Sequence, residues 1–355
     1  MTGGDASALP QAVLHDHLDG GLRVETLIEL AAAAGYTNLP ATEPTDLAAA
    51  MHQDGVESLA DYLAIFSHTI AVMQTAPAIE RVAYEAAIDH AADGVVYAEI
   101  RFGPSLLTEG GLHREAAIEA ALTGLRRAEG ETGLAFGLIV TALRDQDDSD
   151  QVALAAARFV GDGVVGFDLA GPEIGYPAEN HLAAIRLARE WGLGITLHAG
   201  EAVGPEAIAT AIGKCAADRI GHGVRIIDDC SVQDGEIVDL GRVAARVRDH
   251  GVPLEISISS NLHTGVAPDA KSHPLGMLYR AGFNVSINTD NRLMSAVSMS
   301  SELALAQEAF GLRLTDLAVI TTRTLEAGFG DWAVRNSLIQ EVVGPAYAAA
   351  ISGDL

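Results

Sequence analysis

The stretch Gly194-Ile195-Thr196-Leu197-His198-Ala199-Gly200-Glu201 joins a short apolar run to a histidine, a glycine and an acid. Its first residues are apolar or β-branched, as in a buried strand, and the polar side chains come where that strand ends. Glycine at position 200 allows a sharp backbone turn, which brings Glu201 beside His198. The stretch therefore predicts a strand that presents chemically active side chains at its carboxyl end.

Runs of the same kind recur along the chain, separated by alanine-rich segments with helical periodicity. Eight such runs favour an α/β fold of the (β/α)8 TIM-barrel type over an open, doubly wound sheet. Helical segments end at Gly192, Gly251 and Gly282, as expected of left-handed C-terminal caps. No change in composition marks a linker, so we expect one barrel domain over residues 1–355. The eight predicted strands are residues 13–18, 95–102, 136–141, 164–169, 194–198, 219–222, 254–258 and 284–290.

The connection between the first two predicted strands is much longer than the others and contains several helical patterns, over residues 22–92. We expect this helical insertion to act as a lid at the barrel mouth. Four apolar residues within it share the spacing i, i+3, i+4 and i+7 of one helical face, although that spacing more often means ordinary core packing. These residues are Leu59, Tyr62, Leu63 and Phe66.

Composition narrows the classes of function. The formal net charge of −26 sets up a negative field that repels phosphodiester backbones, so we expect no nucleic-acid partner. The first residues lack the features of a signal peptide, and no apolar run is long enough for a membrane span, so we expect a cytoplasmic protein with no membrane partner. The two cysteines, Cys215 and Cys230, cannot form a disulfide framework. A metal in this protein must therefore be held by nitrogen and oxygen.

Further polar residues stand near the ends of predicted strands, at the end of the barrel where active sites lie. His15 and His17 are two residues apart on an extended segment, so both side chains leave the same face and can bind one ion. In Gly221-His222-Gly223 a histidine is flanked by two glycines, which indicates a close approach to the backbone or merely a histidine satisfied in a turn.

Asp290 stands at the end of the eighth predicted strand and becomes a neighbour of the first when the barrel closes. Three imidazoles and one carboxylate form a hard, nitrogen-rich site that suits one Zn²⁺ and leaves a position for water. Zinc can lower the pKa of that water to about 7, which makes hydroxide available at neutral pH.

Taken in order, these motifs resemble the adenosine deaminase family of the amidohydrolase superfamily. The resemblance covers nearly the whole chain, and it implies a zinc-dependent hydrolysis that converts adenosine or deoxyadenosine to the inosine product and ammonia in purine metabolism. The motifs that carry it are His15-x-His17-x-Asp19, Asp168-Leu169-Ala170-Gly171, His198-Ala199-Gly200-Glu201, Gly221-His222-Gly223 and Asn288-Thr289-Asp290.

The resemblance also implies a role for individual residues. The implied zinc ligands are His15, His17, His198 and Asp290. The implied catalytic groups are Glu201, which protonates purine N1, His222, which handles the proton of the zinc-bound water, and Asp290, which orients that water. The implied substrate contacts are Asp19 to the ribose 5′-hydroxyl, the backbone N–H of Gly171 to purine N3, and a hydrophobic lid of Leu59, Tyr62, Leu63 and Phe66.

Two positions depart from the family pattern. Asn291 stands where the family commonly has a second aspartate, and we expect its amide to donate to purine N7 instead. Ser257-Ile258 lies near a point where family members often have Cys-Pro, and we expect local backbone changes without loss of catalysis. A carboxylate at Asp19 repels a 5′-phosphate, which favours adenosine over AMP.

Several alternatives stay open at the level of sequence. The substrate of such an enzyme can instead be aminodeoxyfutalosine, adenine or another modified nucleoside. A binuclear barrel bridged by a carbamylated lysine is disfavoured, because Lys214 and Lys271, the only lysines, fall outside the predicted strands. The signature of the editing-type nucleic-acid deaminases is missing. A barrel that binds nucleosides without turnover is the remaining non-enzymatic hypothesis.

Overall fold

Eight parallel strands form one sheet, and their order in the sheet follows their order in the chain. The computed structural model describes residues 8–53 and 64–353. The strands are β1 (Gln11–His17), β2 (Val95–Phe102), β3 (Ala135–Leu143), β4 (Val164–Ala170), β5 (Gly194–Ala199), β6 (Arg219–His222), β9 (Leu254–Ile256) and β10 (Val285–Ile287). The first and last strands meet, because the backbone N–H of His17 donates to Asp290 O at 2.7 Å and that of Asp290 donates to His15 O at 2.9 Å. The sheet is therefore the expected TIM barrel.

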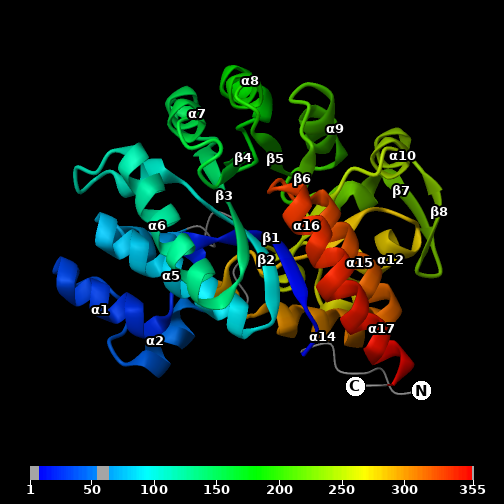
Figure 1. Ribbon diagram of the computed structural model, residues 1–355. Coiled ribbons are helices and arrows are strands. Elements are labelled where there is room, and N and C mark those ends of the chain that lie inside the picture. The colour runs from blue at the N-terminus through cyan, green and yellow to red at the C-terminus, as the bar shows by residue number, and fades with distance from the viewer. Residues whose placement is uncertain (1–7, 54–63, 354–355) are drawn as a thin grey trace.

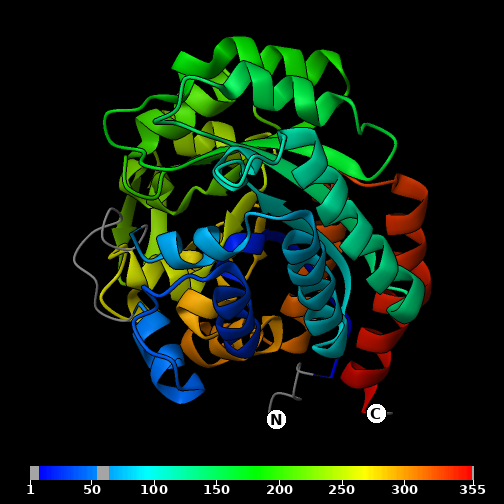
Figure 2. The same ribbon diagram turned by 90° about the vertical axis from the view of Figure 1, so that its left-hand side faces the viewer.

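Helices surround the strands, as the two views of Figures 1 and 2 show. The α-helices are α1 (Val24–Ala34), α2 (Pro44–Met51), α4 (Phe66–Val72), α5 (Ala76–Ala92), α6 (Arg114–Thr132), α7 (Ser149–Ala157), α8 (Leu182–Glu190), α9 (Pro205–Gly213), α10 (Arg242–Asp249), α11 (Ile258–His263), α12 (Leu275–Arg280), α13 (Arg292–Ser295), α14 (Met299–Phe310), α15 (Leu314–Ala327), α16 (Trp332–Ser337) and α17 (Gly344–Ser352). Shorter turns of helix are η1 (Leu18–Gly20), η2 (Pro104–Leu107), η3 (Ala178–His181), η4 (Val224–Asp229), η5 (Ala270–Ser272) and the π-helical η6 (Leu338–Val343).

The expected helical insertion, residues 22–92, contains α1, α2, α4 and α5, and α5 packs against α6 and β2 in the outer layer of helices. Phe66 begins α4 and lines a cavity together with His17 and Asp290, whereas Leu59, Tyr62 and Leu63 lie outside the described residues. Among the described residues, no helix is long and apolar enough to cross a membrane.

The predicted seventh strand is too long at its carboxyl end. Strand β9 stops at Ile256, and α11 begins at Ile258. The backbone N–H groups of Ile258 and Ser259 donate to the buried carboxylate of Glu302 on α14, at 3.0 and 3.3 Å. A carboxylate at the amino end of a helix satisfies free N–H groups and the helix dipole, so α11 starts where the apolar pattern still favours a strand.

A β-hairpin between β6 and β9 is a further element that the strand count did not include. Its strands are β7 (Cys230–Gln233) and β8 (Glu236–Leu240), paired antiparallel outside the barrel. They are joined by Asp234 and Gly235, both with positive φ (53° and 77°). Two such residues in a two-residue loop are the pattern of a type I′ turn.

Charged side chains fill the barrel interior just below the carboxyl ends of the strands. Glu255 accepts hydrogen bonds from Arg101 at 2.7 Å and Arg219 at 2.6 Å, and Arg219 also pairs with Glu99 at 2.6 Å. All four side chains are buried, so each charge depends on its partners for compensation. This layer of paired charges forms the floor of the candidate site.

Candidate active site

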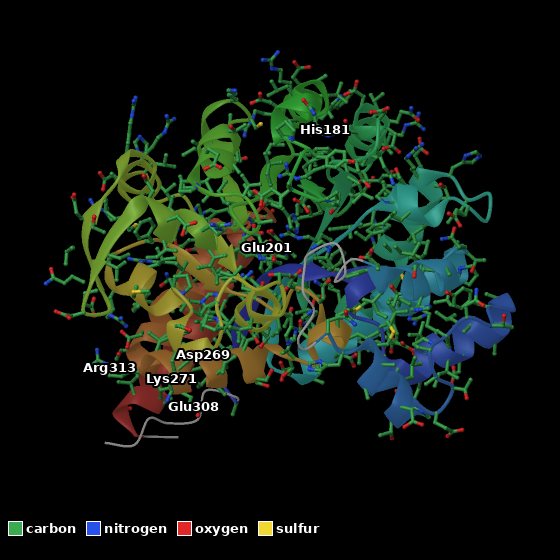
Figure 3. All side chains as sticks on the ribbon, turned by 180° about the vertical axis from the view of Figure 1, so that it is seen from behind. His181, Glu201, Asp269, Lys271, Glu308 and Arg313 are labelled. Carbon is green, nitrogen blue, oxygen red and sulfur yellow. The ribbon has the colours of Figure 1, made fainter. Side chains whose placement is uncertain are left out.

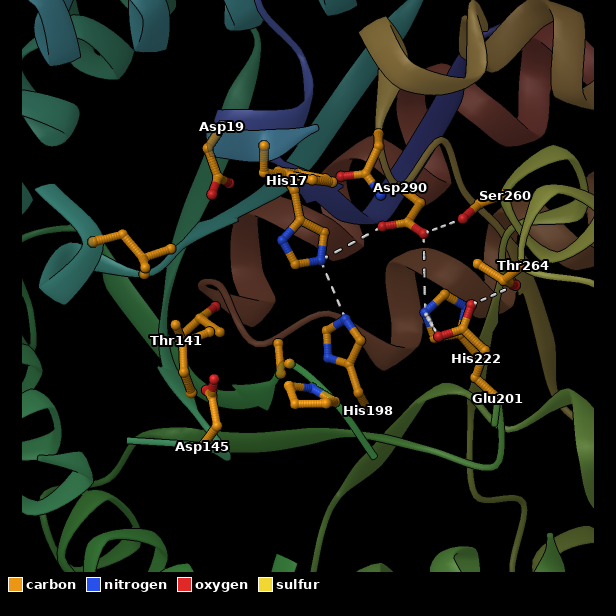
Figure 4. Close-up of a pocket in the computed structure, with 18 of the residues that line it drawn as sticks. His17, Asp19, Thr141, Asp145, His198, Glu201, His222, Ser260, Thr264 and Asp290 are labelled. Carbon is orange, nitrogen blue, oxygen red and sulfur yellow. Dashed lines mark hydrogen bonds and ion pairs between the residues drawn. The ribbon is translucent and has the colours of Figure 1, made fainter. Parts of the chain in front are cut away.

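Three histidines, His15, His17 and His198, and one aspartate, Asp290, converge at the carboxyl ends of β1 and β5 and just after β10. Figure 4 shows His17, His198 and Asp290 of this set. The Nε2 atom of His17 lies 3.3 Å from Nε2 of His15, 3.2 Å from Nε2 of His198 and 3.5 Å from Oδ1 of Asp290. The same oxygen lies 3.4 Å from Nε2 of His15. The four residues predicted as ligands therefore come together around one point, from opposite ends of the chain.

The spacing of these atoms fits four ligands of one ion. Metal bonds of about 2.0–2.1 Å place neighbouring donors about 3–3.5 Å apart, close to the observed separations of 3.2–3.5 Å. His222 lies close enough to His15 and His198 to form a second triplet of possible ligands. Its Nε2 faces the other oxygen of Asp290, at 3.9 Å, so we place His222 beside the metal position rather than among the ligands.

Buried carboxylates orient two of the histidines. Oε2 of Glu255 lies 3.0 Å from Nδ1 of His15, and Oδ1 of Asp168 lies 3.0 Å from Nδ1 of His198. A carboxylate at Nδ1 holds the ring proton there and leaves Nε2 as a bare lone pair for a metal. Sequence reasoning assigned no role to either acid, because both contacts join distant parts of the chain.

Protonation also favours metal binding. Burial lowers the pKa of His17 well below its usual value, and the charge of Asp290 offsets this only in part. Burial would raise the pKa of Asp290, but the hydrogen bond with His15 and electrostatic interactions with the neighbouring imidazoles hold it well below its usual value. A neutral imidazole and an ionised carboxylate are the forms that bind a metal.

The backbone is strained at two of the site residues. His222 has φ 61° and Asp290 has φ 58°, in the left-handed region that side chains with a Cβ rarely adopt. At Asp290 the two hydrogen bonds that close the barrel hold this conformation. Strain of this kind gathers at functional sites, where the surrounding structure compensates for it.

Glu201 lies beside His222 in the wall of the same cavity (Figure 4). Its Oε1 accepts hydrogen bonds from Thr264 Oγ1 at 2.9 Å and Asn261 Nδ2 at 3.4 Å, and its Oε2 lies 3.6 Å from Nε2 of His222. Thr264 and Asn261 belong to α11 and its carboxyl end, and sequence reasoning did not single them out. Oε1 of Glu201 is thus held by hydrogen bonds, whereas Oε2 is free to contact a ligand.

The loop that carries Glu201 is wrapped around a second acid, Glu173. Its carboxylate accepts backbone N–H groups from four consecutive residues, at 2.7, 3.2, 2.8 and 2.8 Å. These residues are Gly200, Glu201, Ala202 and Val203. Successive N–H groups that surround an anion form a nest, so Glu173 fixes the path of the loop after β5.

One cavity lies in front of the converging donors. Its walls include the predicted residues His17, His198, Glu201, His222 and Asp290, and also Asp19, Gly171, Asn291 and Phe66. Oδ1 of Asp19 is buried and has no hydrogen-bond partner among the described residues. Burial raises the pKa of Asp19 to about 6, and the charges of Asp290 and Asp16 add to that increase. Gly171 has φ 90°, a conformation that glycine adopts without strain.

Both lysines lie away from this cavity. Lys214 and Lys271 are exposed, and Figure 3 shows Lys271 far from Glu201, near the outside of the molecule. Lys214 forms an ion pair with Glu179 at 2.6 Å. Neither lysine is placed to bridge two metal ions in the barrel.

Fold and site together define a class: a TIM-barrel hydrolase with a candidate metal centre next to an acid. A family model described as adenosine deaminase matches residues 10–345. A relative named adenosine deaminase from Mycobacterium sp. (strain KMS) is 46% identical over 353 residues, covering 96% of each chain. The chain belongs to the adenosine deaminase family.

Solved structures show the same fold. An adenine deaminase from Arthrobacter aurescens superposes with a TM-score of 0.85 at 23% identity, over 97% of this chain and 100% of that one. An amidohydrolase from Burkholderia ambifaria with bound Zn superposes with a TM-score of 0.83 at 25% identity, over 98% of this chain and 93% of that one.

Proposed function

We propose that the protein hydrolyses adenosine and deoxyadenosine to inosine and deoxyinosine with release of ammonia, using one zinc ion. The observation that carries the proposal is the convergence of three Nε2 atoms and Oδ1 of Asp290 at 3.2–3.5 Å, with Glu201 beside His222 in the same cavity. Membership of the adenosine deaminase family supports the same reaction and substrate.

Zinc is the metal that the donor set favours. We assign His15, His17, His198 and Asp290 as its ligands, since three imidazoles and a carboxylate without thiolate suit Zn²⁺. When bound, the ion supplies a water nucleophile of lowered pKa. The carboxylates of Glu255 and Asp168 keep the ligating nitrogens of His15 and His198 free of protons.

Glu201 supplies the proton that the purine ring needs. Addition of water at C6 breaks the aromaticity of the six-membered ring, so N1 must receive a proton as the new bond forms. Thr264 and Asn261 hold Oε1 of Glu201, which leaves Oε2 towards the cavity. His222 and Asp290 border the place where the water gives up its proton, with Nε2 and Oδ2 3.9 Å apart, and both groups would contact a water molecule bound between them.

Asp19 selects the sugar end of the substrate. Its unpartnered, buried Oδ1 offers an acceptor to a hydroxyl group, and its negative charge repels a phosphate. We therefore assign Asp19 to the ribose 5′-hydroxyl, which favours adenosine over AMP and over adenine, which has no sugar. We further assign the Gly171 N–H to purine N3, Asn291 to N7, and the segment of residues 22–92, with Leu59, Tyr62, Leu63 and Phe66, to a lid.

The test is a panel of ammonia-release assays on the zinc-loaded protein, with adenosine, deoxyadenosine, adenine, AMP and aminodeoxyfutalosine. We expect the first two to have the highest kcat/KM. A clear preference for any of the others would contradict the assignment of the substrate.

The variant that tests Glu201 as the acid is Glu201→Gln. We expect it to retain zinc and to turn over adenosine about 100-fold to 10,000-fold more slowly, the usual contribution of general acid catalysis. Glu190→Gln, at the exposed end of α8, is the control and should be unaffected. Near-normal turnover by Glu201→Gln would remove Glu201 from the role of acid.

A further inference from the structure

A chain of hydrogen bonds leads from the backbone of α12 to His222. The backbone N–H of Leu275 donates to Nδ1 of His273 at 3.2 Å, and Nε2 of His273 lies 3.4 Å from Oδ1 of Asn261. The amide nitrogen of Asn261 lies 3.1 Å from Nδ1 of His222. His273, Asn261 and His222 are each at most 2% exposed, so no solvent competes for these contacts.

The direction of each of these hydrogen bonds follows from the first donor, the backbone N–H of Leu275. A backbone N–H can only donate, so Nδ1 of His273 must accept and the ring proton of His273 sits on Nε2. Burial lowers the pKa of His273 to about 3, so its ring is neutral and carries that single proton. This N–H donates to Oδ1 of Asn261, which turns the amide nitrogen of Asn261 towards His222.

A second contact gives the same orientation independently. Nδ2 of Asn261 also lies 3.4 Å from Oε1 of Glu201. The opposite orientation would place an amide oxygen against a carboxylate oxygen, with no proton between them. Because an amide nitrogen only donates, Nδ1 of His222 is left as an acceptor without a proton.

We propose that Asn261 and His273 are positioning residues that fix the tautomer of His222, so that its proton is held on Nε2 and faces the reacting groups. Nε2 of His222 lies 3.6 Å from Oε2 of Glu201 and 3.9 Å from Oδ2 of Asp290, too far for direct hydrogen bonds and suited to a donor aimed at an atom between them. The catalytic role of the Nε2–H group of His222 rests on the proposed function, whereas the inferred tautomer of His222 does not.

The direct test is the tautomer in the zinc-loaded protein. Long-range ¹H–¹⁵N correlation spectra of protein with ¹⁵N-labelled histidine distinguish a protonated ring nitrogen from a bare one, and His222→Gln assigns the His222 signals by their loss. We expect a bare Nδ1 and a protonated Nε2. A proton on Nδ1 of His222 would overturn the proposal.

The variant test is Asn261→Asp, which keeps the shape of the side chain and replaces the donor by an acceptor. We expect the proton of His222 to appear at Nδ1, and kcat to fall by about 100-fold or more with zinc retained, as when an active-site histidine is held in the wrong tautomer. The matched control is Asn284→Asp, whose amide donates to Gly251 O at the opposite end of the barrel strands. A folded Asn261→Asp protein in which His222 still carries its proton on Nε2 would contradict the proposed role of Asn261 and His273.

The two proposals fail separately. If His222 of the wild-type protein carries its proton on Nε2 but no adenine compound is turned over, the proposed positioning of His222 stands and the proposed function is refuted. If the protein deaminates adenosine and His222 carries its proton on Nδ1, only the proposed positioning is refuted.

Discussion

Oδ1 of Asp168 lies 3.0 Å from Nδ1 of His198, and this contact determines which ring nitrogen of His198 faces the cavity. We expect Asp168→Asn to weaken zinc binding by about 10-fold to 100-fold, because an amide group can donate to Nδ1 and shift the ring proton to the ligating nitrogen. The measurement is the zinc dissociation constant by competition with a chelating dye. Asp218→Asn, in a half-exposed ion pair with Arg189, is the control. Unchanged zinc affinity in Asp168→Asn would show that the contact is not needed.

Glu173 holds the Glu201 loop through four backbone N–H groups. We expect Glu173→Gln to lower the free energy of unfolding by about 1.5–3 kcal/mol, since hydrogen bonds to a charged acceptor are lost and N–H groups are left unpaired. We also expect a lower kcat with normal zinc content, because Glu201 loses its fixed position. Urea denaturation and steady-state assays measure the two effects.

The control for that substitution is Glu179→Gln, which removes only the exposed ion pair with Lys214. Such pairs contribute about 0–1 kcal/mol. Equal effects of the two substitutions would mean that the carboxylate of Glu173 is not what holds the loop.

Stability should depend on pH through Glu302, at the amino end of α11. Burial raises the pKa of Glu302 from 4.5 to about 7, although hydrogen bonds from Ser259 and Ile258 act in the opposite direction. The protonated carboxyl therefore stabilises the fold below pH 4.5, and that contribution is lost as the pH rises through about 7. The loss amounts to about 3 kcal/mol.

Urea denaturation of wild type and Glu302→Gln between pH 4 and pH 8 measures this dependence. We expect the free energy of unfolding of Glu302→Gln, relative to that of wild type, to increase as the pH rises across that range. Glu308→Gln, on the exposed side of the same helix and visible at the periphery in Figure 3, is the control. A constant difference between Glu302→Gln and wild type would contradict the raised pKa.

Asn291 offers a chemical test of the purine orientation. Its buried Oδ1 packs so closely on Gly20 that a Cβ there would lie 2.1 Å away, which leaves the amide nitrogen for the cavity. We expect 7-deazaadenosine, which lacks the N7 acceptor, to have a kcat/KM about 10-fold to 100-fold lower than adenosine, because a buried donor loses its partner.

In Asn291→Ala that preference for adenosine over 7-deazaadenosine should disappear. A preference that persists in Asn291→Ala would show that N7 is read by another group.

The barrel and the convergence of the four candidate ligands were predictable because their signals are local. Each strand is a short apolar run, and each candidate ligand stands where such a run ends, so the fold class brings the ends together. The hairpin also had a local signal, since Asp234-Gly235 lies between two short alternating segments. The hairpin lies outside the alternation of strands and helices that indicates the barrel, so the pattern of the barrel did not predict it.

The supporting residues were not predictable in this way. Glu173, Glu255 and Glu302 act on partners that lie far away in sequence, and nothing near each glutamate indicates that it will be buried. The same non-local contact explains the error at the seventh strand, where Glu302 stabilises the start of a helix. The four-membered path from Leu275 to His222 likewise exists only in three dimensions.

We propose that four side chains from opposite ends of the chain hold one ion that the reaction requires. Titration of zinc into metal-free protein, with ammonia release from adenosine as the readout, tests this requirement. We predict no turnover without metal and a linear rise that stops at one zinc ion per chain. Full turnover in the metal-free protein, or a rise that continues to two ions per chain, would contradict it.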